Sequence, residues 1–441
     1  MSTQAQAESL SDALVDAINS SPELAAGRSN VRVLSEQAVQ ARGAGRIQVS
    51  GLVNLSAQFR DLQRFDYPVT MQLDVVQPLF TGGQVENSTE AAETRITAEE
   101  ARLIATEQGI LLNTVTAFLD VRRDRTLVSL GKNNVRVINE QLRAARERFD
   151  VGEVTRTDVA QAESRLAAAQ SLLAATTGTL RSSEEAYRRV VGRYPGELDP
   201  PPPLPDLPES VDAAIGIGMT NDPDVRAARL ERRAAGSDVR TAIGALLPQV
   251  SLQAQVQRLD TLRNDNIGAT SNGVVGLQVN LPFYSGGVNY SNVREAQAAV
   301  EGAAADINTA LRDAAQQIGD AWADLEVARA SITAGKLEVR AARIAFEGVQ
   351  EEAKVGARTT LDVLDAEQEL LDARGDLVTS QRDEYVAAYS LLFAVGKLTV
   401  KHLGLELSGV APIEDYYAAV KDRNFGYDAT DDTVWTLSYR P

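Results

Sequence analysis

The residues of this chain that could carry chemistry are carboxylates rather than nucleophiles or metal ligands. The sequence has no Cys and a single His, His402, which excludes thiolate sites and any metal site built on several His ligands. No nucleophile–base set can be assembled, and Gly216-Ile217-Gly218 lacks the third glycine and the preceding strand of a dinucleotide-binding loop. The sequence therefore predicts a protein that is not an enzyme and uses no cofactor or metal ion.

Asp362 and Asp365 form the most informative acidic pair. They are three residues apart, so on a helix they share one face. If that face lined the axis of a threefold assembly, six carboxylates would meet there. Their repulsion would raise their pKa values, and the ring would attract cations. The alternative is an ordinary solvated acidic helix surface.

The overall charge argues against a polyanionic partner. The 441 residues include 44 Lys and Arg against 61 Asp and Glu, a net charge of −17. Nucleic acid binding depends on clustered basic residues, so no nucleic acid partner is expected. No run of the sequence approaches the 18 consecutive apolar residues of a transmembrane helix.

The elements that would position the acidic pair belong to an internal repeat. Pro78–Gly83 recurs as Pro282–Gly287, an offset of 204 positions, and Gln48-Val49-Ser50 recurs as Gln249-Val250-Ser251, an offset of 201. The second copy therefore carries three extra residues between about 260 and 272, and the chain consists of two homologous halves. At the same offset of 204, Asp362 and Asp365 correspond to Asp158 and Gln161, so only the second half has both acids.

The repeat divides the chain into four parts. Residues 1–194 form the first repeat and 211–397 the second. Between them, 195–210 contains seven of the chain's 15 prolines, which predicts an extended linker. Residues 398–441 match nothing in the first half.

Each repeat is predicted to contain two strands. Apolar and polar residues alternate with period 2, as in Val49, Val53 and Leu55 against Ser50 and Asn54. This pattern predicts strands with one apolar and one polar face. The predicted strands are 49–60, 69–77, 249–258 and 273–281.

The remainder is predicted to be helical, with long coiled-coil segments. At 1.5 Å per residue, helices over 84–150 and 288–352 would each reach roughly 100 Å, too long for a compact domain. Two heptad-like apolar rows along 358–396 indicate packing against two neighbouring helices. The other predicted helices are 8–43, 155–192 and 209–246.

Four amphipathic strands cannot close on themselves. An apolar outer face is typical of an outer-membrane barrel, whose strand edges cannot stay unpaired in hydrocarbon. Closure therefore requires several chains. Three would form a twelve-stranded barrel wide enough for water, whereas two would form a plugged barrel. A coiled-coil scaffold outside the membrane is the alternative, but it leaves the apolar strand faces unexplained.

The sequence resembles the TolC family over about residues 8–397. The resemblance rests on the two repeats, on Leu281–Gly287 between strand and helix, and on Val355–Ala366. It implies a mainly α fold with membrane β structure: a homotrimer with a twelve-stranded β-barrel in outer-membrane lipid, continuous with a periplasmic α-helical barrel. It also implies an equatorial region built partly by the linker, 195–210, and by the equatorial or periplasmic segment 398–441. Such a protein is a passive exit duct of a tripartite efflux pump or type I secretion system. Its partners would be a periplasmic adaptor and an inner-membrane transporter of the RND or ABC class.

The resemblance also implies roles for particular residues at the periplasmic end. Asp362 and Asp365 match the aspartates of the entrance, where they would set gating and selectivity. Arg358 matches an arginine that locks the gate, with Thr157 and Asp158 as its partners. The family's lock also uses a tyrosine, and Ala353 stands at that position, which predicts a looser gate.

The turns between the paired helices would be the docking sites for the adaptor. A glycine at the end of a helix is ordinarily a C-terminal cap, and that role is compatible with docking. The resemblance implies that a small residue lets the adaptor approach closely. The predicted docking residues are Val151, Gly152 and Thr155 in the first repeat and Val355, Gly356 and Thr359 in the second.

Overall fold

The computed structural model describes residues 7–61, 64–261, 269–405 and 415–423. They fall into two compact units, each drawing on both sequence repeats. The helical unit comprises 1–26, 103–225 and 311–410, and the strand unit comprises 27–102, 226–310 and 411–441. The described parts are mainly helical with one four-stranded antiparallel sheet, as predicted.

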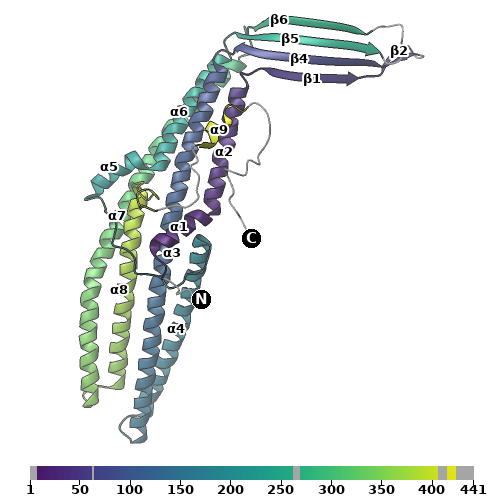
Figure 1. Cartoon of the computed structure of the whole chain (residues 1–441). Coiled ribbons are helices and arrows are strands. Elements are labelled where there is room, and N and C mark those ends of the chain that lie inside the picture. The colour runs from purple at the N-terminus through teal and green to yellow at the C-terminus, as the bar shows by residue number, and fades with distance from the viewer. Residues whose placement is uncertain (1–6, 62–63, 262–268, 406–414, 424–441) are drawn as a thin grey trace. The chain divides into compact units, whose positions relative to one another are not determined.

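Two very long helices dominate the chain (Figure 1). Helix α3 runs over Gln84–Asp150 and α7 over Val288–Lys354, and each is followed by a shorter antiparallel partner. None of the helices in the described ranges is both long and apolar enough to cross a membrane. The other helices are α1 Leu10–Ser20, α2 Pro22–Gly43, α4 Arg156–Val191, α5 Val211–Asn221, α6 Pro223–Gly244, α8 Thr360–Ala394 and α9 Asp415–Val420.

The helices predicted over 8–43 and 209–246 are each interrupted once. The breaks fall at Ser21 and Asp222, which have extended ψ angles of 117° and 124°. Each precedes a proline, Pro22 or Pro223, and the proline ring disfavours the helical conformation of the residue before it. Proline itself fits the first turn of the next helix, where its missing N–H is not needed.

Small residues allow the long helices of the helical unit to pack closely. One buried cluster joins α5, α7 and α8 and includes Ala214, Ile318, Leu325 and Leu391. A second joins α3, α4 and α8 around Leu142, Ala162 and Leu364. The frequent alanines explain how a chain with only 5% aromatic residues can bury its helix faces.

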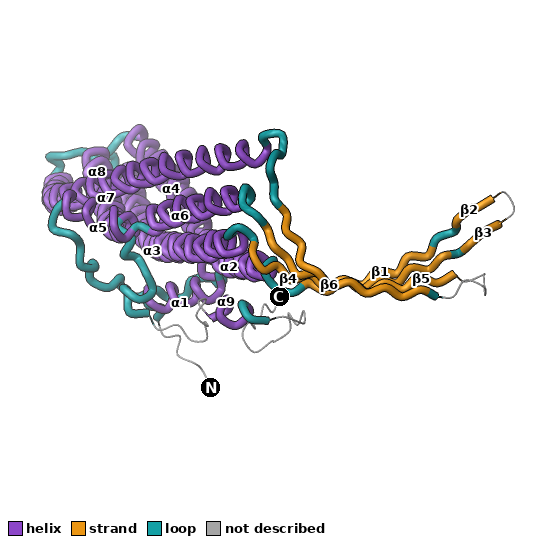
Figure 2. Tube along the Cα trace, turned by 90° about the horizontal axis from the view of Figure 1, so that it is seen from above, coloured by secondary structure: helices purple, strands orange, loops and turns teal. Residues whose placement is uncertain are grey.

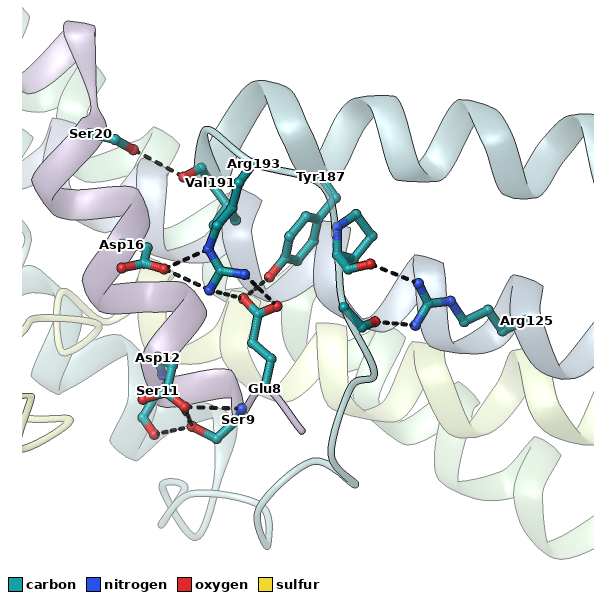
Figure 3. Close-up of polar contacts among 12 residues, drawn as sticks. Glu8, Ser9, Ser11, Asp12, Asp16, Ser20, Arg125, Tyr187, Val191 and Arg193 are labelled. Atoms are coloured by element: carbon teal, nitrogen blue, oxygen red, sulfur yellow. Dashed lines mark hydrogen bonds and ion pairs between the residues drawn. The ribbon is translucent and has the colours of Figure 1, made fainter. Parts of the chain in front are cut away.

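The proline-rich linker has no helix or regular strand, and polar contacts hold it within the helical unit (Figure 3). Arg193 bridges Glu8 and Asp16 at N···O distances of 2.8 and 2.7 Å, and the Tyr187 hydroxyl donates to Glu8. Glu8 also donates its backbone N–H to Glu197 at 2.7 Å. Part of the linker therefore runs as an extended segment bound to the amino-terminal residues.

The sheet has strand order β1-β4-β5-β6, all antiparallel (Figure 1). Strands β2 and β3 form a separate hairpin (Figure 2). The strand predicted over 49–60 is two strands, because pairing with β4 stops at Leu55 and resumes as β2 against β3 at Gln58. The strands are β1 Gln48–Leu55, β2 Gln58–Asp61, β3 Arg64–Asp66, β4 Pro68–Phe80, β5 Gln249–Thr261 and β6 Thr270–Asn280.

The register places most of the apolar residues of the four strands on one face, with Leu52 and Val274 among the exceptions. Val53 lies opposite Met71, Leu73 opposite Val256, and Leu252 opposite Leu277. In the single chain this face is exposed, with Val53 at 70% and Leu277 at 67% of full exposure. An exposed face that carries apolar residues from every strand of the sheet marks a contact with another protein or with a membrane.

The carboxyl-terminal segment is described over 398–405, which belongs to the helical unit, and over 415–423, which packs within the strand unit. Tyr416 donates its hydroxyl to Glu36 at 2.8 Å, and Tyr417 donates to Glu93 at 2.6 Å. Arg46 also donates to the carbonyl oxygen of Lys421 at 2.8 Å. The rest of the 398–441 prediction, at 406–414 and 424–441, lies outside the described residues.

Candidate functional site

All the predicted site residues lie in two structurally matched regions of the helical unit. We define the first tip as residues 148–165, where α3 turns into α4, and the second tip as 352–369, where α7 turns into α8. The two are related by the offset of 204 positions. Both tips place the turn at the end of a long helix and the acidic residues at the start of its partner.

Glycine ends the long helix in the same way at both tips. Gly152 and Gly356 each have φ of +79°, a conformation that residues with a Cβ rarely adopt. At the first tip, Gly152 donates its N–H to the carbonyl of Phe149 at 3.0 Å and Glu153 donates to that of Arg148 at 2.9 Å. The same two bonds recur at the second tip. This is a helix C-terminal motif that requires glycine, so the capping interpretation holds.

Threonine and aspartate start the following helix at both tips. Thr155 and Thr359 are the N-caps, and Asp158 and Asp362 are the third helical residues. The aspartate carboxylate accepts from the threonine N–H at 2.8 Å in the first tip and 2.9 Å in the second. In return, the threonine oxygen accepts from the aspartate N–H. These reciprocal bonds form a capping box and hold the helix start in place.

The capping box sets the electrostatics of Asp362 in the single chain. The N–H and then the hydroxyl of Thr359 donate to its carboxylate, and these bonds hold the pKa of Asp362 below its usual value, with a further contribution from Arg358. The six-acid ring predicted from the sequence would act in the opposite direction. Within one chain, hydrogen bonds to the charged form of Asp362 lower its pKa.

Asp365 and Arg358 each have a partner within the chain. Asp365 pairs with Arg165 of α4 at 2.5 Å, with both side chains about half exposed. Arg358 pairs with Glu352 at 2.9 Å across its own turn, and this bond raises the pKa of Arg358. In the described part of the chain no hydrogen bond or ion pair joins Arg358 to Thr157 or Asp158, the partners that the resemblance implies.

Three residues of this region were missed by the sequence analysis. Glu352 and Arg165 have no distinguishing pattern, because their partners come from a turn and from a neighbouring helix. Glu367 did have a signal, because it shares the apolar face of α8 with Val363 and Leu370. It is only 6% exposed, and burial raises its pKa.

The apolar ends of the tips are exposed. Val151 is 71% and Val355 is 81% exposed, and a Cβ added to Gly152 or Gly356 would have no heavy atom within 4 Å. Each tip therefore presents an exposed valine beside an open glycine. The chain itself does not occupy the space beside the glycines.

Comparisons with known proteins agree with this arrangement. The family model described as outer membrane efflux protein matches residues 13–193 and 218–397. The outer membrane efflux protein BepC of Brucella suis is 37% identical over 427 residues, 97% of this chain and 93% of BepC. The outer membrane protein TolC of Salmonella enteritidis is 26% identical over 419 residues, 91% of this chain and 84% of TolC.

Solved structures share the fold. The Campylobacter jejuni CmeC outer membrane channel superimposes with a TM-score of 0.80 at 16% identity, over 94% of this chain and 89% of CmeC. The family model and the similarity to BepC, together with the shared fold, define the class as TolC-like outer-membrane channel proteins. The chain belongs to the outer membrane efflux protein family, and it is an outer-membrane exit duct for efflux or secretion, with a large periplasmic helical part.

Proposed function

We propose that three copies of this chain close into one duct, the outer-membrane component of a tripartite efflux pump or type I secretion system. The observation that carries this proposal is the exposed apolar face shared by all four strands of the sheet. The sheet ends at β1 and β6, and open strand edges are not tolerated in hydrocarbon. Three copies would supply twelve strands, enough for a water-filled barrel.

The paired helices would continue this duct through the periplasm. The chain would supply no energy itself: an inner-membrane transporter of the RND or ABC class would drive export, and a periplasmic adaptor would connect it to the duct. The exposed valines and open glycines of both tips support docking of the adaptor there. In this proposal Thr155 and Thr359 act through the backbone, because they cap the helices that shape the docking surface.

Asp362, Asp365 and Arg358 would form the gate at the second tip. Three copies of the two acids around an axis would make a cation-attracting ring. Arg358 would lock the closed state by binding Thr157 and Asp158 of a neighbouring chain. Its present partner Glu352 is about half exposed, so exchanging one carboxylate for another on assembly requires little desolvation.

Two measurements test the proposal. Mass determination in mild detergent should give a trimer, and a stable monomer with an intact sheet would overturn it. Leu277→Asp should abolish membrane insertion, because a lipid-facing charge near mid-bilayer costs about 2–4 kcal/mol. The neighbouring Gln278→Asp is the matched control, since Gln278 lies on the polar face and should tolerate the charge.

A further inference from the structure

The sequence repeat preserves strand register. In the first hairpin Gln48 lies opposite Val76, and in the second Gln249 lies opposite Asn280. These pairs are related by the two sequence offsets, 201 positions for the first strand and 204 for the second. The same offsets carry every β1–β4 pair, from Gln48 to Leu55, onto an observed β5–β6 pair.

The central strand pair has no counterpart within one chain. β4 pairs with β5, and the repeat relates β4 to β6 and β5 to β1. β6 and β1 are the two edges of the sheet, so each lacks a neighbour on its outer side in the described chain. The repeat therefore specifies a pairing that only two chains can make.

We propose that β6 of one chain pairs with β1 of the next in the register transferred from β4 and β5, an inference that rests on the proposed trimeric duct. Leu73 opposite Val256 becomes Leu277 opposite Leu55 of the neighbour. Val75 opposite Ala254 becomes Val279 opposite Val53, and Asp74 opposite Gln255 becomes Gln278 opposite Asn54.

The transferred register matches the two faces of the sheet. It sets Leu277 and Val279 beside Leu55 and Val53, all of which are more than half exposed in the single chain. The polar residues Gln278 and Asn54 meet on the opposite face. A slip of one residue would break this match, because side chains alternate between faces with period 2.

A glycine contact beside the sheet supports the same pairing of β6 with β1 of the next chain, which we call the β6–β1 joint. Gly82 and Gly244 approach so closely that a Cβ on Gly244 would lie 2.6 Å from the carbonyl oxygen of Gly82. Their repeat counterparts are Gly286 and Gly43, and a Cβ on either would have no heavy atom within 4 Å in this chain. The β6–β1 joint brings Gly286 of one chain to Gly43 of the next, which gives both glycines the neighbour that Gly82 and Gly244 already have.

Cysteine pairs test the register directly, because the chain has no Cys of its own. Two double variants place cysteines at positions that the proposed register sets opposite each other: Val53→Cys with Val279→Cys, and Asn54→Cys with Gln278→Cys. They sample the hydrogen-bonded and the non-hydrogen-bonded pair, which alternate along antiparallel strands. Opposite Cα atoms lie about 4.5 or 5.5 Å apart, within disulfide range. After oxidation we expect covalent dimers and trimers on denaturing gels, reversed by reductant. Val53→Cys with Leu277→Cys is two residues out of register and should cross-link at least several-fold less.

The outcomes separate the register from the trimer itself. A trimer in mild detergent without cross-linking in either matched pair, or with equal cross-linking in the offset pair, would overturn the register and leave the duct intact. A monomer in mild detergent would overturn the proposed duct, and the joint with it. Cross-linking in a matched pair only, with a trimer in detergent, supports both.

The glycine contact has its own test. Gly43→Val adds a side chain where the single chain has space, so the fold of each subunit should persist by circular dichroism, while trimer recovery falls several-fold. Gly236→Val is the matched control, because it is equally open within the chain and lies outside the proposed contact. Equal trimer recovery for the two variants would overturn the contact between Gly43 and Gly286.

Discussion

The two tips share a backbone and differ in charge. Both have a glycine at φ +79°, a threonine N-cap and an aspartate at the third helical position. The second tip, however, carries Arg358 where the first has Val154, and Glu352 where the first has Arg148. The ion pair between Arg358 and Glu352 therefore exists only at the second tip.

The two tips also differ in their acidic residues. Asp365 of the second tip corresponds to Gln161 of the first, and it binds Arg165 of the first tip. Caps are local requirements of a tight helix turn, so both repeats retain them. Charges on an exposed turn are not required by the fold, so the repeats could diverge there. We infer that the shared geometry serves docking and the charge of the second tip serves the gate.

The largest effect on export is expected when the shared geometry of the two tips is lost. Gly152→Leu combined with Gly356→Leu should abolish export, because bulky side chains would occupy the space open to an adaptor. Export of a transporter substrate from cells is the measurement. Gly152→Ala with Gly356→Ala is the control: it carries the same positive-φ strain, about 1–2 kcal/mol per residue, with little bulk. If the two double variants export equally well, docking does not use this space.

Removing the charge of the second tip should affect selectivity instead. Asp362→Asn with Asp365→Asn should reduce cation preference and block by trivalent cations on the order of tenfold, since a charged constriction concentrates counter-ions by at least that factor. Planar-bilayer recordings measure this, and the trimer should persist.

Asp158→Asn is the matched control for this prediction. It removes the same capping-box carboxylate from the first tip, where Gln161 stands in place of the second acid of the pair. A similar loss of selectivity in this variant would assign the effect to helix capping rather than to the acid ring. Unchanged selectivity in the double variant would mean that Asp362 and Asp365 are a solvated face.

The features that the sequence predicted are those with local causes. α3 covers the predicted range 84–150, because its apolar periodicity runs unbroken to the glycine that ends it. The split of 49–60 was missed because alternation continues through Ser56 and Ala57 although pairing stops. The partners of the candidate gate were missed for a related reason. Arg165 and Asp365 meet only because α4 packs beside α8, and one sequence contains no signal for that packing.

The lock should have a smaller effect than the acid ring. Arg358→Ser should raise conductance less than twofold while selectivity persists, because the family's tyrosine is already replaced by Ala353. Glu352→Gln is the informative companion variant. If Arg358 acts through its own turn, both variants should raise conductance equally; if it acts on Thr157 and Asp158 of a neighbour, Glu352→Gln should leave conductance unchanged or lower it. Single-channel recording distinguishes these results, and wild-type conductance in Arg358→Ser would remove Arg358 from the gate.

The smallest expected effect concerns a buried difference between the repeats. Glu367 is buried, whereas its counterpart Glu163 is half exposed and pairs with Arg146 at 2.6 Å. Burial raises the folded-state pKa of Glu367 above its usual value of 4.5, so its ionised form destabilises the fold at neutral pH. This penalty is relieved as the pH falls through the folded-state pKa. Glu367→Gln should therefore raise the thermal midpoint at pH 7 by about 1–2 °C, because a chain this large unfolds with a large entropy.

The advantage of Glu367→Gln should shrink as the pH approaches 4, where the wild-type carboxyl becomes protonated and neutral. Glu163→Gln is the paired control. It removes an exposed ion pair, which contributes at most about 1 kcal/mol, so its midpoint should stay level or fall slightly. Calorimetry in detergent at pH 7 and pH 4 measures all three proteins. A lower midpoint for Glu367→Gln at pH 7 would mean that the buried carboxylate has a stabilising partner in the assembled protein, and would identify this part of α8 as a contact between chains.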